Sequence, residues 1–212
     1  MNLKKEFPYI ILMALPFIYL AYIWNTLPET VPTHWDASGE IDGYGSKNTL
    51  PLIPFMLPVL VYIIMTIAPK IDPKNKIATM GKKYEQLKFF LVLFMSVLAL
   101  FIIYSSKTKS FSSPNIIYIL LGFLFAGLGN FMKTVKPNYF IGIKTPWTLE
   151  NETVWKKTHL LGGKIWFVGG LLIVFMSLIF TAQTAATLFV IIAVLITIIP
   201  LVHSYIEFKK IK

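Results

Sequence analysis

The sequence contains no cysteine among its 212 residues. A disulfide scaffold and a thiolate metal site are therefore both excluded. Charge is also scarce, because charged residues make up 14% of the chain against about 25% of a typical globular protein. Hydrophobic residues make up 56% and aromatic residues 15%. This composition excludes a disordered chain and argues against a soluble globular one.

In place of charge, the sequence has six long apolar segments. A helix needs about 20 mostly apolar residues to cross about 30 Å of hydrocarbon. We therefore predict an all-α integral membrane protein with six transmembrane helices, the third and fifth extending about a turn beyond their apolar residues. The first segment is too long for the core of a signal peptide and no small-residue cleavage site follows it, so we interpret it as a retained anchor. The six segments are Phe7–Leu27, Leu50–Pro69, Phe89–Tyr104, Asn115–Met132, Ile165–Phe180 and Ala186–Ile206.

The lysines predict the orientation of these helices. Arginine is absent, and 17 of the 20 lysines lie at the two termini and in the second and fourth loops, while only Lys47, Lys107 and Lys109 lie elsewhere. The positive-inside rule places the 17 lysines and both termini in the cytoplasm. Orientation and attraction to membrane lipid thus account for the net charge of +10. We expect no direct contact with nucleic acid, because the basic loops lack a reading module.

The predicted spans divide the chain into three parts. Residues 1–70 form an N-terminal two-span membrane domain with an extracellular loop at 28–49. Residues 71–114 contain a basic cytoplasmic loop and the third span. Residues 115–212 contain spans four to six and a cytoplasmic loop at 133–164.

The spans themselves contain no Asp, Glu, Lys or Arg, and only His203 can titrate. A proton-coupled carrier is therefore disfavoured, because ionisable groups usually mark proton routes in membranes. Proline predicts kinks at Pro16, Pro54, Pro58 and Pro200. Kinks suit ordinary packed helices, but they also suit a transporter or channel with uncharged spans, and both interpretations stay open.

Span four contains a stripe of small residues. Gly122 and Ala126 are four residues apart, and Asn130 follows after another four. The stripe predicts close helix packing with a polar contact at its end.

An enzyme is not expected. Hydrolysis needs a nucleophile with a base or a metal with an open position. The sequence has no H-E-x-x-H and no G-x-S-x-G motif, and the neighbours His34 and Asp36 do not make a constellation. We therefore expect no catalytic residue and no cofactor.

The first loop is acidic and rich in turn signals. Asp36–Gly39 and Asp42–Gly43 are both interpreted as turns, because glycine adopts positive φ at no steric cost. Three interpretations stay open for the acidic side chains and His34. They form hydrogen bonds within turns, bind a divalent cation, or bind a partner. The spacing fits no strong metal motif, so no metal is expected. An acidic loop with Trp35 suits a cationic or amphipathic ligand.

The fourth loop begins with a non-helical stretch between Pro137 and Pro146. Asn151 is expected to cap a helix that begins at Glu152. Apolar residues then recur at helical spacing, and Gly162-Gly163 is expected to end this short interfacial helix before span five. Two interpretations stay open, a structural loop and a docking surface for a cytoplasmic protein.

Both loops carry recognisable motifs. In the first loop the motif residues are Pro28, Val31-Pro32, His34-Trp35, Gly39, Asp42-Gly43 and Ser46-Lys47, which look like the signature of a small membrane domain found more widely. In the fourth loop they are Asn138, Ile141-Gly142, Thr145-Pro146-Trp147-Thr148-Leu149, Glu152, Val154-Trp155, His159 and Gly163. Together these motifs resemble the SdpI family of bacterial membrane immunity proteins. Lys144 stands where that family often has arginine, which keeps the charge but not the planar fork.

The resemblance implies a multi-pass protein of the bacterial cell membrane that gives immunity to a secreted antimicrobial peptide toxin. It also implies a second role, in which the toxin-bound protein holds a cytoplasmic ArsR-type repressor at the membrane. The expected contacts with the toxin are His34, Trp35, Asp36 and Asp42. The expected contacts with the repressor are Lys144, Thr145, Pro146, Trp147, Thr148, Trp155 and His159.

Overall fold

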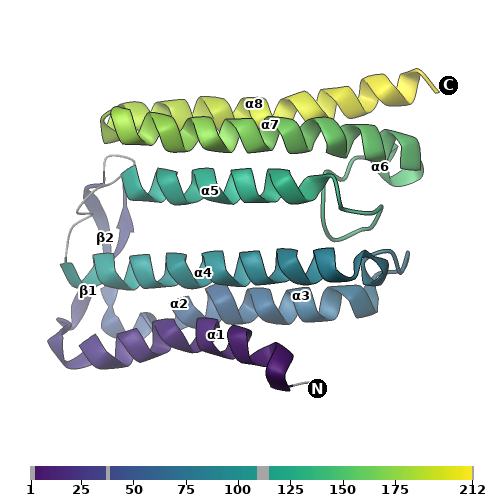
Figure 1. Cartoon of the computed structure of the whole chain (residues 1–212). Coiled ribbons are helices and arrows are strands. Elements are labelled where there is room, and N and C mark those ends of the chain that lie inside the picture. Colours follow the sequence, from purple (N-terminus) through teal and green to yellow (C-terminus); the bar gives the residue numbers. More distant parts are fainter. Residues whose placement is uncertain (1–2, 37–38, 109–114, 212) are drawn as a thin grey trace. The chain divides into compact units, whose positions relative to one another are not determined.

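Figure 1 shows the computed structural model of the chain, which describes residues 3–36, 39–108 and 115–211. The chain is predominantly helical, at 78%. Two strands, β1 (Thr30–Trp35) and β2 (Ile41–Ser46), follow the first helix. The helices are α1 (Leu3–Ile23), α2 (Leu52–Pro54), α3 (Leu60–Ile71), α4 (Lys82–Thr108), α5 (Asn115–Met132), α6 (Pro146–Glu150), α7 (Glu152–Ile179) and α8 (Ala182–Lys209).

Among the residues that the structure describes, six helical segments are long and apolar enough to cross a membrane, which confirms the predicted number of spans. They occupy Lys4–Thr26, Lys47–Ile71, Lys82–Thr108, Asn115–Met132, Glu152–Ile179 and Ala182–Lys209. The third and fifth extend well beyond the predicted turn, because polar helix-forming residues precede their apolar runs.

The chain separates into two compact units. The first unit comprises Met1–Thr66 and Lys88–Pro114, and the second comprises Ile67–Leu87 and Asn115–Lys212. The first contains the hairpin and most of the helices numbered up to α4. The second contains α5 to α8 and the long loop between α5 and α7.

The hairpin corrects the all-α prediction for the first loop. β1 and β2 pair antiparallel, and the predicted turn at Asp42-Gly43 is wrong because both residues lie within β2. Gly43 faces His34 across the ladder, and a Cβ at Gly43 would lie only 2.9 Å from that of His34. The glycine therefore allows close strand approach instead of a turn. The other predicted turn is confirmed at its ends, where the Gly39 amide donates to the Asp36 carbonyl at 3.0 Å; residues 37–38 lie outside the described residues.

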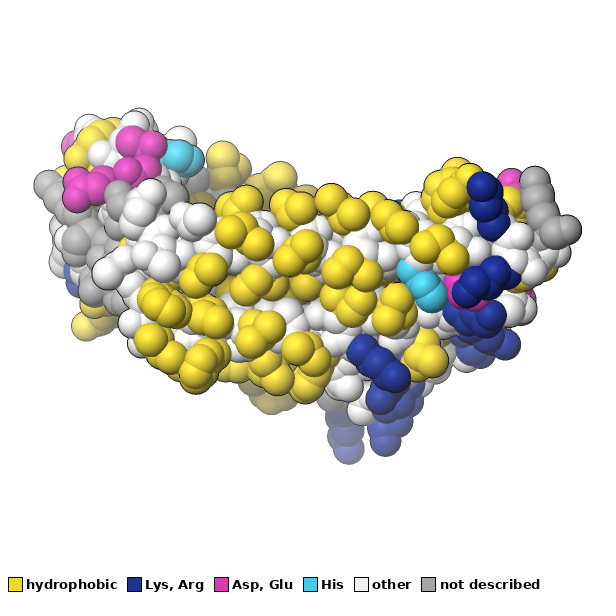
Figure 2. Space-filling model, turned by 90° about the horizontal axis from the view of Figure 1, so that it is seen from above, with side chains coloured by type: hydrophobic (Ala, Val, Ile, Leu, Met, Phe, Trp, Pro, Cys, Tyr) yellow, Lys and Arg dark blue, Asp and Glu magenta, His cyan; other side chains and the backbone are white. Residues whose placement is uncertain are grey.

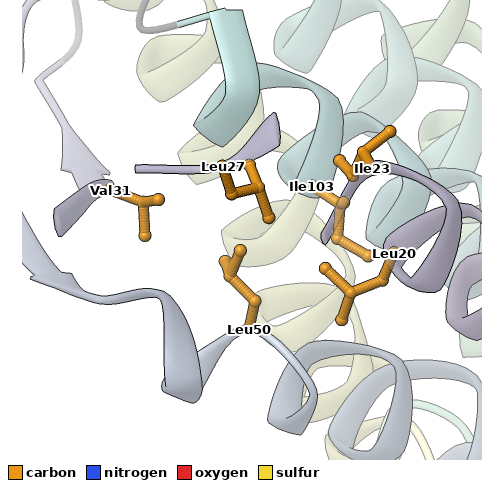
Figure 3. Packing of buried hydrophobic residues seen from close by; sticks show 6 residues of the cluster. All are labelled: Leu20, Ile23, Leu27, Val31, Leu50 and Ile103. Atoms are coloured by element: carbon orange, nitrogen blue, oxygen red, sulfur yellow. The ribbon is translucent and has the colours of Figure 1, made fainter. Parts of the chain in front are cut away.

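The hairpin is anchored in the core of the first unit. Val31 is fully buried and packs in one apolar cluster with residues of α1, α4 and the start of the second span (Figure 3). The Ser106 hydroxyl of α4 also donates to the Pro32 carbonyl at 3.1 Å. The cluster consists of Leu20, Ile23, Leu27, Val31, Leu50 and Ile103.

The spans accommodate their prolines in two ways. Around Pro58 the helix widens into a π-helical turn at Phe55–Val59, in which the Leu60 amide donates to the Phe55 carbonyl. At Pro16 and Pro200, by contrast, α1 and α8 continue through the proline.

Proline has no amide hydrogen, so the carbonyl four residues before it lacks its usual helical donor. At Pro16 and at Pro200, a side chain from another helix donates to that carbonyl instead. Pro16 frees the carbonyl of Leu12, and the Ser96 hydroxyl donates to it at 2.5 Å. Pro200 frees the carbonyl of Ile196, and the Trp166 indole donates to it at 2.8 Å. Neighbouring helices thus supply the hydrogen bonds that proline removes.

The fifth span runs without a break through Gly162-Gly163, so the expected end of a helix there is wrong. Both glycines are buried, and each meets a neighbour at close range. A Cβ at Gly162 would lie 2.6 Å from the Ile143 side chain, and one at Gly163 would lie 2.8 Å from the Gly129 carbonyl. The glycines are therefore packing positions inside one helix rather than a C-cap.

The predicted small-residue stripe does pack a helix pair, α5 against α7. A Cβ at Gly122 would lie 2.8 Å from the Gly170 carbonyl, and one at Gly170 would lie 2.4 Å from the Ala126 amide nitrogen. The stripe continues at buried Gly129, whereas Asn130 is exposed, so the expected polar contact at its end is wrong. Helical spacing explains this difference, because Asn130 lies about 100° around the helix from Gly129.

Candidate functional site

The hairpin brings two of its four predicted site residues together. His34 Nδ1 and Asp42 Oδ1 lie 2.5 Å apart, although they are eight residues apart in the chain. Their side chains are 72% and 48% exposed. An ion pair this exposed contributes little to stability. Because both side chains are exposed, both are accessible to a partner.

The other two predicted residues of the hairpin have local roles. Asp36 Oδ1 accepts the Glu40 amide at 2.9 Å, and the Asp36 amide donates to the Glu40 carbonyl at 2.9 Å. Trp35 is half-buried at the end of β1. Of the three uses left open for this loop, turn hydrogen bonding is the one observed for Asp36. Within residues 3–36, 39–108 and 115–211, no three His, Asp or Glu side chains gather closely enough to hold a metal.

Asn138 organises the first part of the long loop in the second unit. It is fully buried, and its Oδ1 accepts the amides of Phe140 and Ile141, both at 2.7 Å. Its Nδ2 donates to the carbonyls of Lys136 and Ile141 at 2.8 and 3.0 Å. One amide side chain thus replaces the hydrogen bonds that a regular element would supply.

His159 and Trp155 of α7 hold other parts of the loop by hydrogen bonds to its backbone. The Ile143 amide donates to His159 Nε2 at 2.9 Å, so this nitrogen carries no proton. His159 Nδ1 then carries the proton and donates to the Trp155 carbonyl at 2.8 Å. The two rings stack with centroids 4.0 Å apart, and the Trp155 indole donates to the Val135 carbonyl at 2.8 Å.

Gly142 makes this approach possible. Its φ of 111° favours glycine, and a Cβ there would lie 2.4 Å from His159 Nε2.

The loop ends in a reciprocal cap on α6. The Thr148 amide donates to Thr145 Oγ1 at 3.2 Å, and the Thr145 amide donates to Thr148 Oγ1 at 2.9 Å. Thr145 Oγ1 also lies 3.2 Å from the Ser204 hydroxyl of α8. Both threonines are buried, so they fix the loop and present no surface. Asn151 caps α7 as predicted, accepting the amides of Thr153 and Val154.

Three predicted site residues remain accessible on this loop. Lys144 and Pro146 are exposed, and Trp147 is half-buried with its ring 5.0 Å from that of Tyr205. Lys144 Nζ donates to the carbonyls of Tyr139 and Phe140 at 3.1 and 3.3 Å. The structure therefore separates the predicted set into an exposed group of Lys144, Pro146 and Trp147 and a buried supporting group of Thr145, Thr148, Trp155 and His159.

An apolar cavity of about 280 Å³ lies beside the exposed group. Ile143 and Lys144 form its wall on the loop side, and Phe131, Trp166 and Leu201 belong to the helices that line it. Its size and lining suit a few apolar side chains or part of a small ligand.

Two lysines, Lys74 and Lys136, link the long loop and α6 to the loop before α4. The sequence indicated both only as orientation signals. Lys74 Nζ donates to the Leu149 carbonyl at 2.7 Å and lies 4.9 Å from the centre of the Tyr139 ring. Lys136 Nζ donates to the Thr79 carbonyl at 2.9 Å. These contacts depend on which loops meet in space, and no local signal indicates them. Asn138 was named only as part of the family motif, although its role in the loop could have been predicted, because asparagine directly after a proline is a common turn signal.

Six spans and two ordered polar segments define a multi-pass membrane protein whose polar surfaces are candidates for binding. The SdpI/YfhL protein family matches residues 134–204, which include the whole of α6 and α7 and most of α8. A Domain of unknown function (DUF1648) matches residues 11–57, which include the hairpin. These matches confirm the resemblance to the SdpI family.

Two curated proteins extend the comparison. The chain is 26% identical over 209 residues to a Bacillus subtilis protein named Immunity protein SdpI, covering 98% of each chain. It is 40% identical over 58 residues to an uncharacterized protein of Archaeoglobus fulgidus, covering 27% of this chain and 32% of the other. No solved structure matches. The full-length relative carries the name of an immunity protein and not of an enzyme.

Proposed function

We propose that this chain is a membrane immunity protein that gives its cell resistance to a secreted peptide toxin. The observation that carries the proposal is the similarity to Immunity protein SdpI, which extends over 98% of both chains. Similarity over this length includes both polar segments as well as the spans, and both are ordered here by their own contacts.

In this proposal the hairpin receives the toxin. His34 and Asp42 are exposed, and Asp36 and Trp35 lie at the adjoining strand end. An acidic surface with an aromatic side chain complements a cationic, amphipathic peptide. The hairpin is anchored by Val31 in the core of its unit, so it presents these side chains on a rigid support.

The long loop serves the second role, signalling by recruitment of an ArsR-type repressor. Lys144, Pro146 and Trp147 form its contact surface, and the apolar cavity beside Lys144 can receive an apolar side chain of the partner. The four buried residues Thr145, Thr148, Trp155 and His159 support that surface.

Survival of toxin-treated cells tests the immunity proposal. A sensitive bacterium expressing the chain is expected to survive the secreted peptide toxin of the related system better than the same strain with an empty vector. D42K reverses one charge of the hairpin and should reduce protection, whereas E150K, an exposed acid at the end of α6, serves as a matched control and should not. Equal survival with and without the chain, once its presence in the membrane is shown, would contradict the proposal.

A separate readout tests signalling. Membrane recruitment of a labelled ArsR-type repressor in the presence of toxin should be lost in K144E and retained in K156E, which makes the same change at an exposed site on α7. Recruitment that is equally retained in both variants would remove the long loop from the proposal without affecting immunity.

A transporter or channel is the alternative. Two of the four prolines that suggested it are Pro16 and Pro200. The carbonyls that they free, at Leu12 and Ile196, accept hydrogen bonds from Ser96 and Trp166 and are therefore unavailable to line a solute path. Flux of small solutes through vesicles containing the purified chain distinguishes this alternative from binding alone.

A further inference from the structure

Two grooves of the second unit meet at one lysine, Lys164 of α7. The first groove has a volume of about 370 Å³, lies between α5 and α7, and is lined by Asn130, Lys133 and Lys164 with apolar neighbours. The second groove, also about 370 Å³, lies between α7 and α8 and continues from Lys164 over apolar side chains alone. Lys164 therefore joins a polar, positively charged groove to an apolar one.

The helix geometry explains this junction. Phe167 of the first groove and Val168 of the second lie three and four residues after Lys164, so each is its neighbour one turn further along α7. Glycines form the floors: Gly129 and Gly163 let α5 and α7 touch, and a Cβ at Gly169 would lie 2.5 Å from the Ile196 side chain. Both grooves are thus built into the helix packing.

The depth of the two lysines places them at the level of lipid headgroups. Lys164 lies about 22 Å along α7 from its end at Ile179, and Lys133 directly follows the last residue of α5. Both therefore lie near the edge of a hydrocarbon layer about 30 Å thick, where a lysine ammonium can reach the phosphate groups of anionic lipids. Within the part of the chain that the structure describes, neither lysine forms an ion pair.

Figure 2 shows how side chains of each type are distributed over the α7–α8 face. Hydrophobic side chains cover its middle, and lysine side chains gather toward the end of α8 that carries the C-terminus. A ligand suited to this face has a negative head and an apolar tail.

We propose that Lys133, Lys164 and Asn130 bind the phosphate group of an anionic phospholipid whose acyl chain lies in the groove between α7 and α8. The two ammonium groups and the Asn130 amide donate to the phosphate oxygens. The acyl chain contacts Val168, Leu172 and Leu195, which line the second groove. The site uses none of the residues assigned to the toxin or the repressor in the proposed function, and it does not depend on that function.

Lipid-dependent thermal unfolding of the purified full-length chain in a nonionic detergent tests the site. Phosphatidylglycerol should raise the unfolding temperature more than phosphatidylcholine with the same acyl chains. In K133Q/K164Q the apparent affinity for phosphatidylglycerol should fall roughly twenty-five-fold, about fivefold for each lysine. Equal unfolding temperatures of this variant and the wild type without lipid show that the fold is retained.

Matched variants and a headgroup probe make the result specific. K82Q/K83Q removes the same charge at exposed sites outside the grooves and should retain the affinity, as should the charge-conserving K133R/K164R. Inorganic phosphate alone should give little stabilisation, because it lacks the acyl chain. The proposal would be overturned by no preference for phosphatidylglycerol, by an equal fall in K82Q/K83Q, or by full stabilisation from phosphate alone.

Discussion

Single side chains replace regular backbone hydrogen bonding in both polar segments, the hairpin of the first unit and the long loop of the second. Asn151 and Asp36 act on amides within five residues, and such local contacts could be predicted from their residue types. His159 could not be assigned in this way, because it accepts the Ile143 amide 16 residues away. The sequence indicated Trp155 and His159 as partner contacts. The structure places both inside, where they support the exposed Lys144.

Replacing His159 by phenylalanine tests its role as an acceptor. H159F keeps an aromatic ring against Trp155 but leaves the buried Ile143 amide without a partner, which should cost about 1–3 kcal/mol of unfolding free energy. H203F provides the control, because His203 is half-buried and is not part of this loop's support. Denaturant unfolding in detergent measures the difference, and equal stability of the two variants would contradict the role.

Alanine substitutions at two glycines with positive φ distinguish the cost of backbone strain from the cost of a steric clash. G81A adds a Cβ with nothing within 4 Å, so only the backbone conformation, φ 53° with ψ −125°, opposes it, at about 1–3 kcal/mol. G142A adds a Cβ that would lie 2.4 Å from His159 Nε2 as well as meeting a φ of 111°. G142A should therefore lower the unfolding temperature clearly more than G81A. A similar loss in both would mean that the loop moves away from His159 freely.

At the scale of elements, apolar runs predicted the six spans, because a helix in hydrocarbon must satisfy its own backbone. The hairpin was missed because its second strand contains two glycines and an aspartate, residues that ordinarily indicate turns. Its pairing depends on contacts such as Val31 in the core, which local patterns do not contain. The continuity of α7 through Gly162-Gly163 was missed for a similar reason, since helix packing overrides the usual preference of glycine for helix ends.

The Trp166 indole donates to the carbonyl that Pro200 frees, so substitutions of Trp166 and Pro200 should have coupled effects on the free energy of unfolding. W166F keeps the ring packing against Phe125 but removes the donor to Ile196, and should cost about 1 kcal/mol. In the P200A background an amide is again present in α8, so the same W166F change should cost less. A double-mutant cycle on unfolding free energy measures the coupling. Strictly additive effects would show that the indole and the proline act independently.

For the whole molecule, the lysine count predicts an orientation that single introduced cysteines can report. The chain has no cysteine of its own, so every labelled thiol is the introduced one. E40C, beside the hairpin, should react with a membrane-impermeant maleimide on intact cells, and E150C should react only after the membrane is opened. Both positions are exposed, which makes them comparable. Labelling of E150C on intact cells would reverse the orientation and the assignment of the two partner surfaces.

The non-helical stretch before α6 has one more consequence, for hydrogen exchange. The amides of Phe140, Ile141 and Ile143 lie outside any helix or strand, yet each donates to a buried side chain. Exchange with solvent requires that such a bond opens, so these three amides should exchange as slowly as those of the adjoining helices. On this timescale the loop behaves as part of the helical scaffold, and the partner proposed for it would meet a surface that is already in place before the encounter.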